Sequence, residues 1–156
     1  MCKAYDDAYF MSLAMEEARQ AAAEGEVPVG AVVVRASEVI ATGRNHRERA
    51  KNALSHAELE AIDGACKALG GWRLFGCTLY VTLEPCPMCA GAIVNARLDR
   101  VVYGAADPKA GSCGSVIQLF DLPYNHRPAC EGGVQGEACA ALLSDFFRSL
   151  RSRRDG

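Results

Sequence analysis

Residues 38–104 alternate between strand-like and helix-like segments, and this order limits the fold more than any other property of the chain. Residues 38–43, 77–83 and 100–104 are rich in β-branched residues and have the length of strands. Between them, residues 57–69 carry apolar side chains at helical spacing, and residues 87–95 begin with a proline suited to a first helical turn. Strand–helix–strand units pair their strands in parallel through right-handed connections. The sequence therefore predicts an α/β fold.

The segments before this region add a helix and a hairpin. Residues 11–22 carry apolar side chains at helical spacing, and Gly25 is expected to end that helix. Residues 27–35 form a β-branched run that is separated by only two residues from the strand at 38–43. This spacing predicts an antiparallel hairpin. Beside the parallel strands, the hairpin makes the sheet mixed.

The region after residue 104 is less regular. Residues 105–133 are rich in glycine, proline and aspartate, with only a weak strand at 128–131. An irregular stretch of this length in a compact domain is commonly functional, so we expect binding loops there. A final helix is predicted from about Gly136.

The length, the apolar runs and the net charge of the chain indicate its domain number, its location and its possible partners. The 156 residues fit a single domain, residues 1–156. No apolar run approaches the roughly 20 residues that span a bilayer, and the acidic start differs from a signal peptide, so we expect a cytoplasmic protein without a membrane segment. A formal charge of −2 provides no general attraction to nucleic acid. A polyanion would need a local patch, which the last nine residues supply with Arg148, Arg151, Arg153 and Arg154.

Two short motifs stand at the expected starts of two helices: His56-Ala57-Glu58, and Pro85-Cys86-Pro87-Met88-Cys89. Residues two apart on a helix diverge by about 200°. His56 and Glu58 can therefore serve one metal only if it lies off the helix N-terminus, and the same holds for Cys86 and Cys89. Two cysteines and one histidine are typical zinc ligands that leave the fourth position open for catalysis. Glu58, not itself a ligand, is then placed to transfer protons.

Each motif has a simpler interpretation when taken alone. Ser55 to Glu58 matches a capping box, in which Glu58 only satisfies a backbone amide. Cys86 and Cys89 could be half of a structural zinc knuckle, but a second close cysteine pair is absent from the sequence. The occurrence of both motifs at two helix starts favours catalytic zinc. The six other cysteines are interpreted as small hydrophobic or incidental thiols: Cys2, Cys66, Cys77, Cys113, Cys130 and Cys139.

The H-x-E and P-C-x-x-C pair is the signature of zinc nucleobase deaminases. Beyond it, residues 82–97, 102–105, 107–111 and 139–148 resemble the bacterial tRNA-specific adenosine deaminases, within the cytidine/deoxycytidylate deaminase-like superfamily. The resemblance extends from residue 26 to residue 148. It implies a three-layer α/β/α cytidine-deaminase-like fold with a mixed five-stranded sheet flanked by helices, and a homodimer with one Zn²⁺ per subunit.

The resemblance also implies a reaction and a partner. The family converts adenosine to inosine at the wobble position of a tRNA anticodon, which here would be that of an arginine tRNA. A zinc-bound hydroxide would attack C6 of the flipped-out adenine, with Glu58 as the proton shuttle and His56, Cys86 and Cys89 as the metal ligands.

Seven residues are assigned by this resemblance to the anticodon stem-loop. Asn45 would hydrogen-bond the nucleotide, although it could be an ordinary turn asparagine. Three residues of the loop after residue 104 would surround the anticodon or be plain loop polarity. Three on the last helix offer aromatic and guanidinium surfaces suited to stacking on unpaired bases, although one of the two phenylalanines could be a core residue instead. They are Asp107, Lys109 and Ser112 on the loop, and Phe146, Phe147 and Arg148 on the helix.

Two other functions stay open at this point. A deaminase of free guanine, cytosine or cytidine would use the same four residues, but it needs neither the basic helix end nor the loop at 107–111. A zinc-stabilised binding module without catalysis would keep the RNA contacts, but the intact Glu58 argues against it.

Overall fold

The structure is a computed structural model that describes residues 6–155, so Cys2 and the outermost ends of the predicted domain lie outside the described residues. The elements are α1 (Asp7–Ala23), β1 (Gly30–Arg35), β2 (Glu38–Arg44), α2 (Arg47–Ala50), α3 (Ala57–Leu69), β3 (Cys77–Leu83), α4 (Pro87–Asn95), β4 (Arg100–Ala105), the 3₁₀ helix η1 (Leu119–Asp121), β5 (Ala129–Glu131) and α5 (Gly136–Asp155).

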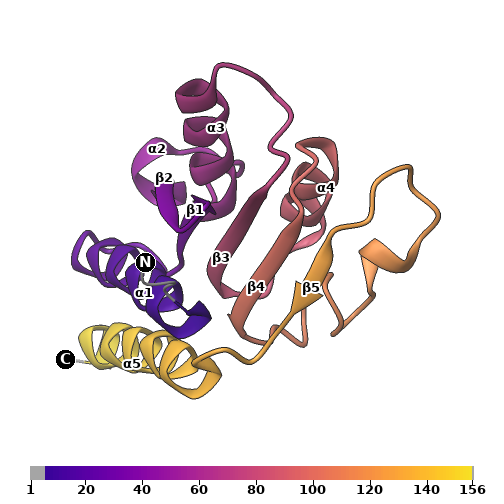
Figure 1. The fold of residues 1–156 in the computed structure, drawn as a ribbon. Coiled ribbons are helices and arrows are strands. Elements are labelled where there is room, and N and C mark those ends of the chain that lie inside the picture. The colour runs from indigo at the N-terminus through magenta and orange to yellow at the C-terminus, as the bar shows by residue number, and fades with distance from the viewer. Residues whose placement is uncertain (1–5, 156) are drawn as a thin grey trace.

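Five strands form one mixed sheet in the order β2-β1-β3-β4-β5, as Figure 1 shows. The hairpin of β1 and β2 is antiparallel, β1 also pairs antiparallel with β3, and the pairs β3–β4 and β4–β5 are parallel. The predicted mixed sheet is confirmed. One detail differs, because β2 and β3 run in the same direction but have β1 between them. The connection through α3 therefore crosses over β1.

Helices cover both faces of the sheet, which confirms the predicted three-layer α/β/α arrangement. On one face, α3 and α4 pack their apolar sides against Val33, Leu79 and Val101. On the other face, α1 and α5 pack against Val32 and Val102. Neighbouring residues of β1 thus face opposite layers, as the two-residue repeat of a strand requires. In Figure 1, α1 and α5 lie side by side.

Two glycines set how closely the helices approach the sheet. A Cβ atom on Gly43 of β2 would lie 2.3 Å from the carbonyl oxygen of Ala57 in α3, and one on Gly30 of β1 would lie 2.0 Å from that of Ala14 in α1. No side chain fits at either distance. Helix α3 therefore lies directly on β2, and this contact fixes the position of its first turn.

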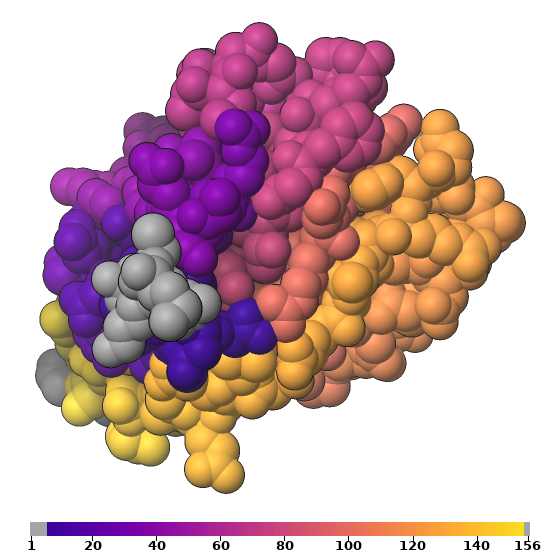
Figure 2. All heavy atoms as spheres, in the orientation of Figure 1, coloured from indigo at the N-terminus to yellow at the C-terminus, as the bar shows by residue number. Residues whose placement is uncertain are grey.

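The irregular regions contain two short helices that periodicity does not predict. The polar stretch after β2 includes α2, which has no buried residues. The long connection between β4 and α5 contains η1 and the three-residue β5, so the weak strand predicted at 128–131 exists but is short. In Figure 2 this connection, in orange, forms the right-hand part of the visible surface. Within residues 6–155 no helix is long and apolar enough to cross a membrane.

Candidate metal centre and substrate pocket

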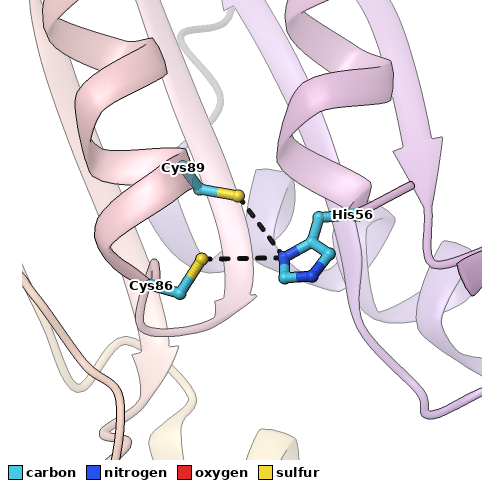
Figure 3. Close-up of side chains that lie close together, drawn as sticks. All are labelled: His56, Cys86 and Cys89. Carbon is cyan, nitrogen blue, oxygen red and sulfur yellow. Dashed lines mark hydrogen bonds between the residues drawn. The ribbon is translucent and has the colours of Figure 1, made fainter. Parts of the chain in front are cut away.

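The two motifs meet because their helices start at the same edge of the sheet. Helix α3 comes after β2, with only the short α2 between them, and α4 follows β3; these two strands run in the same direction. His56 is the N-cap of α3 and Cys86 is the N-cap of α4, both with extended backbone, and Pro87 opens α4. Figure 3 shows His56, Cys86 and Cys89 pointing toward one another. The ligands thus lie off two helix N-termini, whose partial positive charges favour thiolates.

The distances within this cluster suit zinc. The Nδ1 atom of His56 lies 3.7 Å from the Sγ atom of Cys86 and 3.5 Å from that of Cys89. All three donor atoms lie within 4.8 Å of one another. A tetrahedral zinc ion with bonds of about 2.3 Å to sulfur and about 2.0 Å to nitrogen separates such atoms by about 3.5 Å. The donor set and its spacing therefore fit one zinc ion with an open fourth position.

The electrostatics of the three side chains also favour a cation. The Cys89 thiol and the His56 ring lower the pKa of Cys86 to about 4, so Cys86 is a thiolate at neutral pH. The Cys86 sulfur raises the pKa of His56, and the hydrogen bond to Cys86 together with burial raises that of Cys89. In the absence of a metal, His56 and Cys89 thus tend to keep their protons beside the Cys86 thiolate. A coordinated thiol is deprotonated, so a metal ion would take the place of these protons.

Glu58 lies beside the cluster without belonging to it. Glu58 is 4% exposed, and burial raises the pKa of its carboxyl group to about 7. A group with this pKa can accept and donate a proton near neutral pH. The capping-box interpretation is wrong, because the N-cap is His56 rather than Ser55 and has no side-chain cap hydrogen bond. Glu58 has a structural environment suited to proton transfer.

A cavity of about 200 Å³ opens next to the cluster and combines polar with apolar walls. It brings together five residues predicted from the sequence: Asn45, His56, Glu58, Cys86 and Asp107. The other lining residues are Val27, Val29, Arg47, Ala57, Leu83, Glu84 and Ala110. The apolar members come from the segments around β1, α3 and β3 and from the loop after β4. A flat aromatic base with polar edges suits such a pocket.

Asn45 supports the loop that it belongs to while it lines the pocket. It is 8% exposed, its Nδ2 atom donates to the carbonyl of Val27 at 3.2 Å, and its Oδ1 atom accepts from the backbone amide of Arg47 at 3.0 Å. An asparagine amide has a second N–H and a second lone pair. Nucleotide binding by Asn45 stays a prediction.

The three predicted loop residues have different environments. Asp107 lines the pocket, and its Oδ1 atom accepts from the backbone amides of Lys109 and Ala110. Lys109 is exposed. Ser112 is 1% exposed, and its hydroxyl donates to the carbonyl of Ala110 at 3.3 Å. Asp107 and Ser112 therefore have roles in shaping the loop, and RNA contact by all three stays a prediction.

The predicted residues of α5 are apart from the pocket lining. Phe146 is half-buried and Phe147 is 41% exposed, with their ring centroids 5.5 Å apart in an edge-to-face arrangement. Arg148 is exposed and pairs with Asp145 at 3.2 Å. An exposed phenylalanine next to an arginine is suited to stacking on unpaired bases. Their role in RNA binding stays a prediction.

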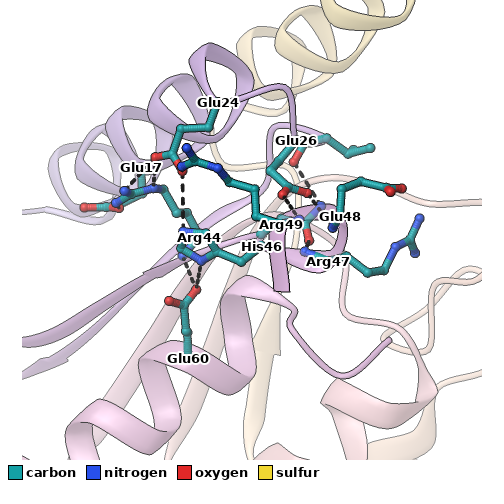
Figure 4. Close-up of polar contacts among 11 residues, drawn as sticks. Glu17, Glu24, Glu26, Arg44, His46, Arg47, Glu48, Arg49 and Glu60 are labelled. Atoms are coloured by element: carbon teal, nitrogen blue, oxygen red, sulfur yellow. Dashed lines mark hydrogen bonds and ion pairs between the residues drawn. The ribbon is translucent and has the colours of Figure 1, made fainter. Parts of the chain in front are cut away.

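A polar network around the end of β2 and around α2 was not predicted. Glu24 pairs with Arg44 and Arg49, as Figure 4 shows. Glu26, 1% exposed, accepts hydrogen bonds from the backbone amides of Glu48 and Arg49 and so holds α2 in place. This network fixes the segment that carries Asn45 and Arg47 at the pocket.

Glu84 is another residue at the pocket that sequence reasoning missed. It follows β3 directly, is 2% exposed and lines the pocket. Burial alone raises the pKa of its carboxyl group, but hydrogen bonds from Ser115 and from backbone amides outweigh burial and hold the pKa below its ordinary value. A lone acidic residue between an apolar strand and a proline was the available signal.

Comparisons with known proteins agree on a chemical class. The family model of the MafB19-like deaminases matches residues 5–151. A tRNA-specific adenosine deaminase of Bacillus subtilis is 50% identical over 149 residues, which make up 95% of this chain and 92% of that protein. A structure from a study of A-to-I editing by tRNA:A34 deaminases has a TM-score of 0.84 and 46% identity, covering 86% of this chain and 99% of the other. A guanine deaminase from Bacillus subtilis has a TM-score of 0.64 and 36% identity, covering 80% of each chain.

Proposed function

The chain belongs to the family of tRNA-specific adenosine deaminases, and we propose that it converts adenosine to inosine at the wobble position of a tRNA anticodon by zinc-dependent hydrolysis. The observation that carries this proposal is the juxtaposition of three zinc-type ligands with the buried carboxyl group of Glu58, whose raised pKa suits proton transfer, beside one pocket. Residues 1–156 act in this proposal as one cytoplasmic deaminase domain that pairs into a homodimer, with an arginine tRNA as the substrate.

The residues of the site have two separate roles, metal binding and proton transfer. His56, Cys86 and Cys89 would hold the zinc ion, which supplies Lewis acidity and lowers the pKa of a bound water toward neutrality. Glu58 accepts a proton from the attacking water and delivers it to N1 of adenine. Glu58 then takes the second proton from the hydroxyl group that has added to C6 and passes it to the amino group, which leaves as ammonia while the C6 carbonyl of inosine forms.

The pocket walls orient and enclose the base. Val29, Leu83 and Ala110 contact its faces and exclude bulk water, which strengthens the polar interactions inside the pocket. Asn45 and Asp107, which both line the pocket, would hydrogen-bond the target nucleotide. Lys109 and Ser112 on the same loop, with Phe146, Phe147 and Arg148 on α5, make up the proposed contacts to the rest of the anticodon stem-loop.

The test is formation of inosine in an anticodon stem-loop. The zinc-loaded protein is incubated with a stem-loop that carries adenosine at the wobble position, and nucleosides are identified by mass spectrometry. We expect inosine from the wild type. Glu58→Ala should reduce its rate by at least about 10²-fold while the zinc content stays at one per chain. Inosine formation by Glu58→Ala at the wild-type rate would refute the assigned role.

Guanine deamination is the second candidate, because the chain is 36% identical to a guanine deaminase of the same fold. Guanine, cytosine and cytidine are therefore offered in parallel with the stem-loop. Turnover of a free compound without turnover of RNA would replace the proposed substrate. Binding of RNA without any turnover would indicate a zinc-stabilised binding module.

A further inference from the structure

The carboxylate of Glu84 collects four hydrogen bonds from one loop. Its Oε1 atom accepts from the backbone amide of Asp107 at 3.0 Å and from the hydroxyl of Ser115. Its Oε2 atom accepts from the backbone amides of Cys113 and Ser115, both at 3.0 Å. All four donors lie between residues 107 and 115. We call residues 107–115 the clamped loop.

The clamped loop is folded around this carboxylate. A Cβ atom on Gly111 would lie 2.3 Å from Oε2 of Glu84 and 2.5 Å from the carbonyl oxygen of Asp107, so the loop passes directly over the carboxylate. The backbone amide of Ser112 donates to the carbonyl of Pro85 at 2.8 Å. Asp107 turns the start of the loop through bonds to the amides of Lys109 and Ala110.

The same strand end serves both the clamped loop and the metal ligands. Glu84 follows β3, and Pro85 separates it from the ligand Cys86. Two residues of the clamped loop, Asp107 and Ala110, line the pocket that also contains His56 and Cys86. The position of the loop relative to the metal centre thus depends on a carboxylate anchored beside the centre. Hydrogen bonds to a charged acceptor are about twice as strong as neutral ones.

We propose that Glu84 is a positioning residue that holds the clamped loop in the shape required for binding the RNA substrate. The inference rests on the proposed function. Glu84 acts through Asp107 and Ala110 and takes no part in proton transfer. Substrate binds only to the correctly shaped loop, so the apparent dissociation constant rises in inverse proportion to the population of that shape. Loss of the clamp should therefore raise KM and leave kcat nearly unchanged.

Glu84→Gln is the sharpest variant because it preserves the size of the side chain. A glutamine amide places an N–H₂ group where one carboxylate oxygen accepted, so the bond from at least one backbone amide is lost, and the bonds that remain lose the charge of their acceptor. We expect KM for the anticodon stem-loop to rise about tenfold, with kcat reduced less than about threefold. Glu131→Gln is the matched control. Glu131 is an exposed carboxylate that accepts from Arg100, and this variant should keep the wild-type KM.

Hydrogen exchange provides a readout that does not depend on activity. In Glu84→Gln, the amides of residues 107–115 should exchange faster, while those of β3 and α4 keep their protection and zinc stays at one per chain. Ser115→Ala removes one of the four bonds at an exposed residue and should give a smaller rise in KM. This milder variant decides the question if Glu84→Gln fails to fold or loses zinc.

Two results would overturn the proposal: unchanged exchange of the clamped loop in Glu84→Gln, or an unchanged KM for RNA in a fully zinc-loaded Glu84→Gln protein. With Ser115→Ala as the deciding variant, an unchanged KM has the same meaning. If the wild type forms no inosine in RNA, the proposed function fails. The exchange experiment then still decides whether Glu84 holds the loop.

Discussion

The Nδ1 atom of His56 lies 3.5 Å from the Sγ atom of Cys89, although the two residues are 33 positions apart and lie at the starts of different helices. The contact needs both helix starts to be correctly placed on the sheet. A shift of either helix start would therefore separate the candidate metal ligands.

Cys89→Ser should lose most of the bound zinc. Serine offers a harder, less easily deprotonated ligand than a thiolate, and zinc sites of this type depend on sulfur. Metal analysis after gel filtration checks this result, and Cys66→Ser is the control because Cys66 lies outside the cluster. Full zinc content in Cys89→Ser would remove this residue from the ligand set.

Asp7→Asn should lower stability at neutral pH by about 1–2 kcal/mol, because Asp7 accepts two hydrogen bonds from Arg100 and one from Tyr80. Arg100 is the main group that lowers the pKa of Asp7 in the folded state, against the effect of burial. The contribution is therefore complete above the unfolded pKa of about 4 and is lost as the pH falls through the folded value.

Urea unfolding of the wild type and Asp7→Asn at pH 7 and at pH 3 tests this sign. The difference in the free energy of unfolding should shrink at the lower pH. Asp63→Asn is the control, since Asp63 pairs with Lys67 on an exposed helix surface and should change stability by less than about 0.5 kcal/mol. A difference that grows toward low pH would contradict the assignment.

Gly43→Ala should destabilise the protein by at least about 2 kcal/mol and weaken zinc binding. The added Cβ would meet the carbonyl oxygen of Ala57 at 2.3 Å, so α3 would have to move away from β2 and carry His56 with it. Thermal unfolding and zinc titration measure the two effects. Gly71→Ala has open space around the new atom and should leave both nearly unchanged.

Phe147→Ala should weaken RNA binding about tenfold without affecting zinc content. Phe147 is 41% exposed and its ring packs edge-to-face on Phe146, so a large part of the residue is free to meet a base, and stacking on one base contributes about 1–3 kcal/mol. Binding of the stem-loop can be measured with Glu58→Ala as the background, which prevents turnover. Equal affinities with and without Phe147 would place RNA recognition elsewhere.

Local sequence patterns predicted most elements and the three residues that the fold brings together as candidate metal ligands. The predicted ranges 77–83 and 87–95 coincide with β3 and α4, because a buried β-branched run and a helix-starting proline are strong local signals. His56, Cys86 and Cys89 were recognisable because their chemical types occur at two helix starts, which face one point.

The missed features depend on contacts between distant residues. Helix α2 consists of three charged residues and an alanine, none of them buried. Its backbone is held by Glu26, which precedes its two hydrogen-bond partners in α2 by 22 and 23 positions. Glu84 is bound to residues 23 to 31 positions later. Likewise, the position of β1 between β2 and β3 depends on how the strands pair in space, and the spacing of apolar residues along the sequence does not indicate it.

The separation of the three ligands along the chain also affects how fast the folded state is lost. Strand β1 must pair with both β2 and β3 before His56 can meet the cysteines, and contacts between such distant residues are slow to form. Metal bound there would stabilise an interaction absent from the folding transition state. Zinc should therefore slow unfolding and leave refolding unchanged, which stopped-flow kinetics with and without zinc can measure. The lifetime of the folded protein thus depends on the same three side chains as its chemistry.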